Sequence, residues 1–219
     1  LGMPFSDPMA DGPTIQKAND RAIKNKMNLK KTFDLIKKFR KKNKITPLVL
    51  MGYYNPIHRF GVKNFINQIN KNKVNGIIVV DLPPEEDNEL CLPAMKNKIH
   101  FIKLATPTTD KNRFKKIIKN SSGFIYYVSI TGITGANYKS NIKLEREIKN
   151  LKKLTELPIA VGFGIKNKKD VKKLSRNADA VVVGSSIIKK IEEALKKKYK
   201  KIKLINYVLS YIRNLSSDL

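Results

Sequence analysis

PIAVGFGIKNKKDVKKLSRNADAVVVGSS, residues 158–186, contains the pattern that decides the fold. It holds two short apolar runs, 158–161 and 178–183, and between them a lysine-rich stretch in which we expect a helix at 168–175. Short runs that are rich in branched apolar residues are typical of buried strands. A strand, a helix and a second strand in this order predict a parallel βαβ unit.

The same alternation continues towards both ends of the chain. We expect further strands at 47–51, 76–80, 100–104 and 124–128, and helices at about 29–43, 57–73, 85–97, 110–119, 142–155, 186–195 and 200–217. Another strand is expected to end at residues 1–2, because the loop that would follow it is present. This rhythm predicts an α/β fold of the (β/α)₈ TIM-barrel type.

The length limits how much of such a barrel the sequence can supply. A (β/α)₈ barrel typically needs about 250 residues, whereas this sequence has 219. We therefore expect the first strand, the first helix and most of the second strand to be lacking, as in a partial sequence. No linker interrupts the alternation, so residues 1–219 are expected to form a single barrel domain that is incomplete at its N-terminus.

The strongly basic composition is better explained by lysines on the exposed faces of the helices than by a nucleic-acid site. The net charge is +27, from 45 Lys and Arg against 18 Asp and Glu, but 38 of the basic residues are lysines and only 7 are arginines. Arginine is the better reader of phosphates and bases, and the lysines are spread along the polar faces of the expected helices. The sequence contains no run of 18 apolar residues, so it does not predict a membrane-spanning helix. A single cysteine, Cys91, fits a reducing compartment, so we expect a cytoplasmic protein, with the plastid stroma left open.

Residues with catalytic chemistry follow the expected strands. In such barrels the active site lies on the loops after the carboxyl ends of the strands. Residues 1–13, LGMPFSDPMADGP, form a Gly- and Pro-rich segment that predicts a shaped loop. That loop carries Asp7 and Asp11, and carboxylates of this kind suit general acid–base catalysis.

Glycines follow the last two expected strands and indicate a phosphate site. Gly162 and Gly164 come after one strand, and Gly184 and Ser185 come after the next and open a helix. Glycines let backbone amides approach an anion, and a helix N-terminus adds a favourable dipole. Phosphate binding after strands 7 and 8 recurs in this fold.

Two further features concern the loops and the metal chemistry. The loop after Val128 is uncharged, polar and about a dozen residues long, which fits a closing lid.

The two histidines, His58 and His100, have no Cys, His or carboxylate residues near them at the spacing of metal ligands, so we expect no metal site.

Together these residues resemble the tryptophan synthase alpha subunit family. Its signature Leu-Glu-Leu-Gly-x-Pro-Phe-Ser-Asp-Pro-x-Ala-Asp-Gly-Pro matches residues 1–13 from its second leucine onward. The resemblance continues through the whole chain, at Asp81-x-Pro83, Tyr126, Thr131-Gly132-Ile133-Thr134-Gly135, Gly162-Phe163-Gly164-Ile165 and Gly184-Ser185.

The resemblance implies a lyase of tryptophan biosynthesis that cleaves indole-3-glycerol phosphate to indole and glyceraldehyde 3-phosphate by a retro-aldol step. It implies that Asp11 is catalytic and accepts a hydrogen bond from the indole N–H. The substrate-binding residues would be Tyr126, Thr134, Phe163, Leu104, Met51 and Ile78, and the phosphate would be held by Gly135, Gly164, Gly184 and Ser185.

The resemblance also implies a partner. Asn55 and Asp81 lie where the family contacts the beta subunit, which receives indole through a tunnel within an alpha2beta2 complex. The alpha subunit needs no cofactor, because pyridoxal phosphate belongs to the beta subunit.

One departure from the family concerns the second catalytic carboxylate, which would act together with Asp11. The family's principal acid–base glutamate stands immediately before the residue that matches Leu1, so the 219 residues as written do not include it, and we expect them to be inactive by themselves. Two alternatives remain open at this point. One is a non-catalytic activator that docks on a beta-like subunit, and the other is a different phosphate-binding barrel such as indole-glycerol-phosphate synthase.

Overall fold

The computed structural model describes residues 1–129, 138–162 and 164–217. The chain divides into two compact units. The first comprises Leu1–Leu104 and Asp110–Ile125, and the second comprises Ala105–Thr109 and Tyr126–Leu219. The expectation that the chain is a single domain stays a prediction.

A parallel sheet forms the centre of the first unit. Its strands are β1 (Val49–Gly52), β2 (Gly76–Val79) and β3 (His100–Phe101), in the order β1-β2-β3. All four residues of β2 are buried, as expected for a strand with helices packed around it. The expected strand end at residues 1–2 is confirmed, because Gly2 forms a parallel bridge with Met51 and the Met51 N–H donates to the carbonyl of Leu1 over 3.0 Å.

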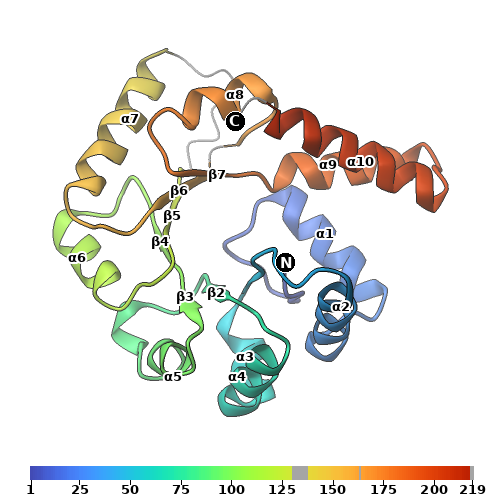
Figure 1. The fold of residues 1–219 in the computed structure, drawn as a ribbon, viewed down its shortest axis with the longest axis horizontal. Coiled ribbons are helices and arrows are strands. Elements are labelled where there is room, and N and C mark those ends of the chain that lie inside the picture. Colours follow the sequence, from blue (N-terminus) through green and yellow to red (C-terminus); the bar gives the residue numbers. More distant parts are fainter. Residues whose placement is uncertain (130–137, 163, 218–219) are drawn as a thin grey trace. The chain divides into compact units, whose positions relative to one another are not determined.

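Helices precede, connect and follow these strands in the first unit (Figure 1). They are α1 (Pro13–Lys24), α2 (Leu29–Lys42), α3 (Tyr54–Phe60), α4 (Val62–Lys71), the 3₁₀ turn η1 (Pro84–Glu86), α5 (Cys91–Lys96) and α6 (Lys111–Lys119). The core is apolar and close-packed, with Ile36, Phe65, Ile77 and Phe101 all at most 1% exposed. Cys91 lies within this core, in agreement with a small buried apolar role.

Three helical segments of the first unit differ from the sequence-based expectation. The helix α1 was not expected, and it has no buried residue that would give a clear apolar stripe. The helix expected at 57–73 is divided into α3 and α4 by Gly61, whose φ of 90° cannot continue a helix. The helix expected at 85–97 is reduced to η1 and the short α5.

The remaining strands form a second sheet. They are β4 (Lys103–Ala105), whose first two residues belong to the first unit, β5 (Ile125–Val128), of which all but Ile125 belongs to the second unit, and β6 (Ile159–Gly162) and β7 (Ala180–Val182) of the second unit, in the order β4-β5-β6-β7. The strands β6 and β7 are parallel, with Gly162 opposite Val182. The strand expected at 100–104 is therefore two short strands, β3 and β4, which belong to different sheets.

Four helices accompany this second sheet (Figure 1). They are α7 (Tyr138–Lys152), α8 (Lys168–Leu174), α9 (Ser185–Lys196) and α10 (Lys201–Ser216). The helix α10 packs against α9 and α8. Within the described residues, no helix combines the length and the hydropathy needed to span a membrane. The alternation of parallel strands and helices confirms the predicted α/β class of fold.

Candidate active site

Asp11 lies in the opening loop of the first unit, immediately before α1. The loop is shaped by backbone hydrogen bonds, from the Met9 N–H to the carbonyl of Asp7 over 2.9 Å and from the Asp11 N–H to the carbonyl of Pro8 over 3.0 Å. Asp7 is exposed and accepts a hydrogen bond of 2.5 Å from the Ser6 hydroxyl. The two aspartates thus differ, since Asp7 is bonded within the exposed loop and Asp11 is half-buried.

The side chain of Asp11 has one tyrosine partner. The Tyr53 hydroxyl donates a hydrogen bond of 3.0 Å to Asp11 Oδ2. Burial raises the pKa of the Asp11 carboxyl, and the hydrogen bond from Tyr53 opposes that increase. Burial and the bond to Asp11 also raise the pKa of Tyr53 to about 12, so the phenol remains a proton donor at neutral pH. Sequence reasoning did not assign Tyr53 a role, although its place directly after β1 was a signal.

Three of the expected apolar substrate contacts lie on strands of the first unit. Met51 and Ile78 stand opposite each other in the register of β1 and β2. Ile78 is 6% exposed, whereas Met51 and Leu104 are half-buried. The structure thus brings Met51 and Ile78 together as neighbours.

Tyr126 and Gly162 form a close contact in the second unit. Tyr126 lies in β5 and Gly162 ends β6. A Cβ atom on Gly162 would stand only 2.6 Å from the Tyr126 hydroxyl. Glycine at this position therefore provides the space that the expected substrate-binding tyrosine occupies.

The glycines expected to bind phosphate lie past the ends of β6 and β7. Gly162 pairs with Val182. Gly164 lies two residues after Gly162 and Gly184 lies two residues after Val182, so the two glycines follow β6 and β7 at equivalent positions. Gly184 is the N-cap of α9, and Ser185 is its first residue. The first amides of a helix have no partner within the helix and attract anions. The neighbouring Ser186 hydroxyl is buried and has no hydrogen-bond partner among the described residues, which is a further polar group at this end of α9.

Some of the expected site residues lie outside the described part of the chain. They are Thr134, Gly135 and Phe163, together with the greater part of the expected lid after Val128.

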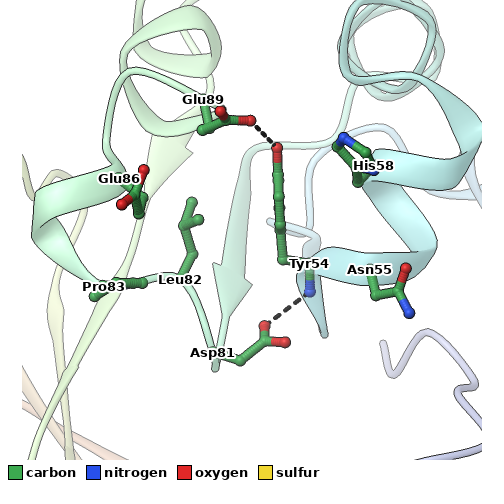
Figure 2. Close-up of a pocket in the computed structure, with 8 residues that line it drawn as sticks. All are labelled: Tyr54, Asn55, His58, Asp81, Leu82, Pro83, Glu86 and Glu89. Atoms are coloured by element: carbon green, nitrogen blue, oxygen red, sulfur yellow. Dashed lines mark hydrogen bonds between the residues drawn. The ribbon is translucent and has the colours of Figure 1, made fainter.

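A shallow pocket of about 450 Å³ in the first unit brings together the two residues expected at the partner interface, Asn55 and Asp81. Figure 2 shows Tyr54 standing in this pocket between the two segments that line it. Its N–H donates to Asp81 Oδ1 over 2.8 Å, and its hydroxyl donates to Glu89 over 2.5 Å. The other lining residues are His58, Leu82, Pro83 and Glu86.

The pocket is acidic although the chain as a whole is strongly basic. Asp81, Glu86 and Glu89 line it, whereas the chain has a net charge of +27. Among the described residues, no group of three or more His, Cys, Asp or Glu side chains is arranged to hold a metal ion.

Comparisons with known proteins agree with the motif and the fold. A family model described as tryptophan synthase alpha chain matches residues 1–215. The chain belongs to this family. Its members are lyase subunits of tryptophan biosynthesis, and the similarity to their solved structures confirms the TIM-barrel class of fold.

Two solved structures show the extent of the similarity. The tryptophan synthase subunit alpha of Legionella pneumophila strain Paris is 34% identical, with a TM-score of 0.89, and the match covers 98% of this chain and 78% of that one. A chain of the tryptophan synthase complex of Pyrococcus furiosus is 38% identical, with a TM-score of 0.85, and the match covers 98% of this chain and 84% of that one.

Proposed function

We propose that this chain cleaves indole-3-glycerol phosphate to indole and glyceraldehyde 3-phosphate. The observation that supports this proposal most strongly is the half-buried carboxylate of Asp11, within the family motif and bonded to Tyr53. In a retro-aldol cleavage, the indole ring is protonated at carbon 3 and the adjacent side-chain hydroxyl loses its proton. The carbon–carbon bond then breaks, its electron pair returns to the ring, and the hydroxyl carbon becomes the aldehyde.

Asp11 acts on the positive charge that develops in this step. Protonation of carbon 3 makes the ring nitrogen cationic, and a carboxylate that accepts a hydrogen bond from the indole N–H stabilises that charge. In this proposal Tyr126, Thr134, Phe163, Leu104, Met51 and Ile78 contact the substrate.

The amides of Gly135, Gly164, Gly184 and Ser185 bind the phosphate in this proposal. The N-terminus of α9 supports this part of it, and so does the Ser186 hydroxyl, for which the described residues supply no hydrogen-bond partner. No cofactor is needed, because the reaction is acid–base chemistry.

The second carboxylate of the proposed mechanism is the family's glutamate, which stands immediately before the position of Leu1. A polypeptide of residues 1–219 alone is therefore expected to bind substrate without cleaving it. The test compares this polypeptide with a chain extended to include that glutamate, measuring indole and glyceraldehyde 3-phosphate by chromatography. Equal amounts of both products from the extended chain support the proposal, and indole release from residues 1–219 alone contradicts the role of the glutamate.

The same assay separates the enzyme from its alternatives. An extended chain that releases no indole but stimulates a beta subunit is a non-catalytic activator. Turnover of carboxyphenylamino-deoxyribulose phosphate, instead of indole-3-glycerol phosphate, identifies an indole-glycerol-phosphate synthase.

We further propose that the partner is a tryptophan synthase beta subunit, in an alpha2beta2 complex in the cytoplasm. The partner carries the pyridoxal phosphate and receives indole through a tunnel. The pocket that contains Asn55, Asp81 and Tyr54 supports a docking role, since it gathers acidic groups on a basic chain.

An interface substitution with a matched control tests this partner. Asp81→Asn keeps the oxygen that accepts from Tyr54 but removes the charge, and we expect about tenfold weaker binding of the beta subunit in calorimetric titration. Asp34→Asn makes the same change in an exposed part of α2 and should leave the affinity unchanged. Equal affinities for the two variants would place the interface elsewhere.

A further inference from the structure

Tyr53 is held in one orientation by its position in the fold. It follows β1 directly and is the N-cap residue of α3. Its side chain is buried, with 3% of the residue exposed. Its ring packs against Phe5 of the opening loop, with 5.3 Å between the ring centroids. The phenol therefore has little freedom to rotate away from the loop.

The hydroxyl of Tyr53 makes two hydrogen bonds to consecutive residues of that loop. It accepts from the Ala10 N–H over 3.0 Å and donates to Asp11 Oδ2 over 3.0 Å. The bond from Ala10 occupies one acceptor position of the phenol oxygen, which favours an orientation of the proton towards Asp11. The Tyr53 hydroxyl thus binds both the backbone of the loop, at Ala10, and a side chain of the loop, at Asp11.

We propose that Tyr53 is the positioning residue for Asp11, holding Oδ2 so that Oδ1 faces the indole N–H. The inference rests on the proposed function, because it concerns the carboxylate that receives this N–H. Oδ1 accepts no hydrogen bond from the side chains and amides that the structure describes, whereas Oδ2 is engaged by Tyr53. A carboxylate that is fixed by one oxygen need not reorganise when charge develops on the substrate.

Electrostatics support the same role. Burial raises the pKa of Asp11, and a hydrogen bond donated to the ionised form lowers it. Tyr53 thus favours the carboxylate form that can accept from the substrate. Tyr54, the next residue, has a different task, because its hydroxyl donates to Glu89 in the pocket.

The first test measures the rate constants of Tyr53→Phe in the chain extended to include the family's glutamate. This variant keeps the ring and its contact with Phe5 but removes the hydroxyl. We expect kcat to fall about tenfold and KM to rise by no more than about fivefold, because the bond from Asp11 to the indole N–H is weakened in the bound substrate and weakened more in the transition state. The matched control is Tyr207→Phe, which removes a phenol that donates to Glu193 over 2.8 Å in the second unit, and it should keep both constants. A Tyr53→Phe enzyme with wild-type kcat overturns the proposal.

The second test asks whether Tyr53 acts through Asp11. The probe is indole-3-propanol phosphate, which keeps the indole N–H and phosphate but lacks the hydroxyls needed for cleavage, and its Kd is measured by titration. We expect about fivefold weaker binding for Tyr53→Phe, and no additional loss when Tyr53→Phe is added to Asp11→Ala. Equal losses in both backgrounds would show that Tyr53 acts independently of Asp11 and would overturn the proposal.

Two further measurements keep this test decisive. If Tyr53→Phe does not fold, difluorotyrosine at position 53 keeps the shape and makes the phenol a stronger donor, so probe binding should tighten; unchanged binding contradicts the proposal. If the unmodified enzyme neither binds the probe nor releases indole, the proposed function itself fails. If it does both and the Tyr53 variants match it, only the positioning role fails.

Discussion

Lys103 and Asp87 form a buried ion pair in the first unit. The Lys103 ammonium lies 2.6 and 2.5 Å from the two carboxylate oxygens of Asp87, and the two side chains are only 5% and 6% exposed. Asn120 donates a further hydrogen bond of 2.9 Å to Asp87 Oδ2. The pair links β4 to the segment between η1 and α5. That segment includes Glu89, which lines the pocket proposed for the partner.

Removal of one member of this pair should be strongly destabilising. Lys103→Met leaves Asp87 as a buried charge without its cation, and we expect the free energy of unfolding to fall by about 3 kcal/mol in urea titration. Adding Asp87→Asn removes that charge but keeps an acceptor for Asn120, so the double variant should regain most of the loss. Lys37→Met, which breaks an exposed pair with Asp34, should change stability by less than about 0.5 kcal/mol. A Lys103→Met protein as stable as the original would contradict this account.

Gly162→Ala should disturb Tyr126. The added methyl group would lie 2.6 Å from the Tyr126 hydroxyl and 2.8 Å from its ring, so the tyrosine must move. We expect a loss of about 1–3 kcal/mol in stability and weaker substrate binding, measured by urea unfolding and by KM.

The Gly162 prediction has an internal control. Combining Gly162→Ala with Tyr126→Phe removes the atom of closest contact, so the double variant should be less destabilised than the sum of the single changes. Strict additivity would show that the two residues do not compete for this space.

Lys98 offers a stabilising substitution. It follows α5 with φ of 60°, in the left-handed region that a lysine adopts at a cost and a glycine adopts freely. Lys98→Gly should therefore increase stability by about 0.5–1 kcal/mol. Lys96→Gly, in the last turn of the same helix, should reduce it by about 1 kcal/mol. Both are measured by thermal unfolding, and loss of stability in Lys98→Gly would argue against strain at this position.

The parts of the fold that could be predicted from the sequence are those with strong periodicity. The runs at 76–80 and 158–161 are buried strands because their apolar residues have no polar alternation. The helix α1 could not be found this way, since none of its residues is fully buried. The break at Gly61 has a local signal in the glycine itself. The division of 100–105 between two sheets depends on tertiary pairing, which local patterns do not encode.

The candidate site shows the same limit. The strand-end rule selected Asp11, Gly164 and Gly184 as candidates because they follow the expected strands, where the active site of such a barrel lies. Tyr53 was not assigned a role, because a tyrosine after a strand is common and only the folded loop brings Ala10 and Asp11 to its hydroxyl. That the buried Ser186 hydroxyl has no hydrogen-bond partner among the described residues likewise becomes apparent only when the packing around α9 is known.

Asp11→Asn should make the protein slightly more stable at neutral pH. Burial raises the pKa of Asp11 in the folded state, so ionisation of this group favours the unfolded chain. This loss of stability is absent at low pH, where the carboxyl is protonated in both states, and develops as the pH rises through the unfolded and then the folded pKa. We expect Tm to increase by at most about 3 °C at pH 7, with a smaller difference near pH 3. A lower Tm for Asp11→Asn at pH 7 would contradict a desolvated carboxylate.

The most direct test of the central claim compares the two aspartates of the opening loop. Indole release from indole-3-glycerol phosphate is measured for Asp11→Asn and Asp7→Asn, in the chain extended to include the family's glutamate and without added beta subunit. The substitutions are chemically identical, but Asp11 is half-buried against Tyr53 and Asp7 is exposed. We predict a fall in kcat of at least about 100-fold for Asp11→Asn and less than about threefold for Asp7→Asn. An Asp11→Asn enzyme that keeps more than about a tenth of the original rate would contradict the assignment of Asp11 as the catalytic carboxylate of this loop.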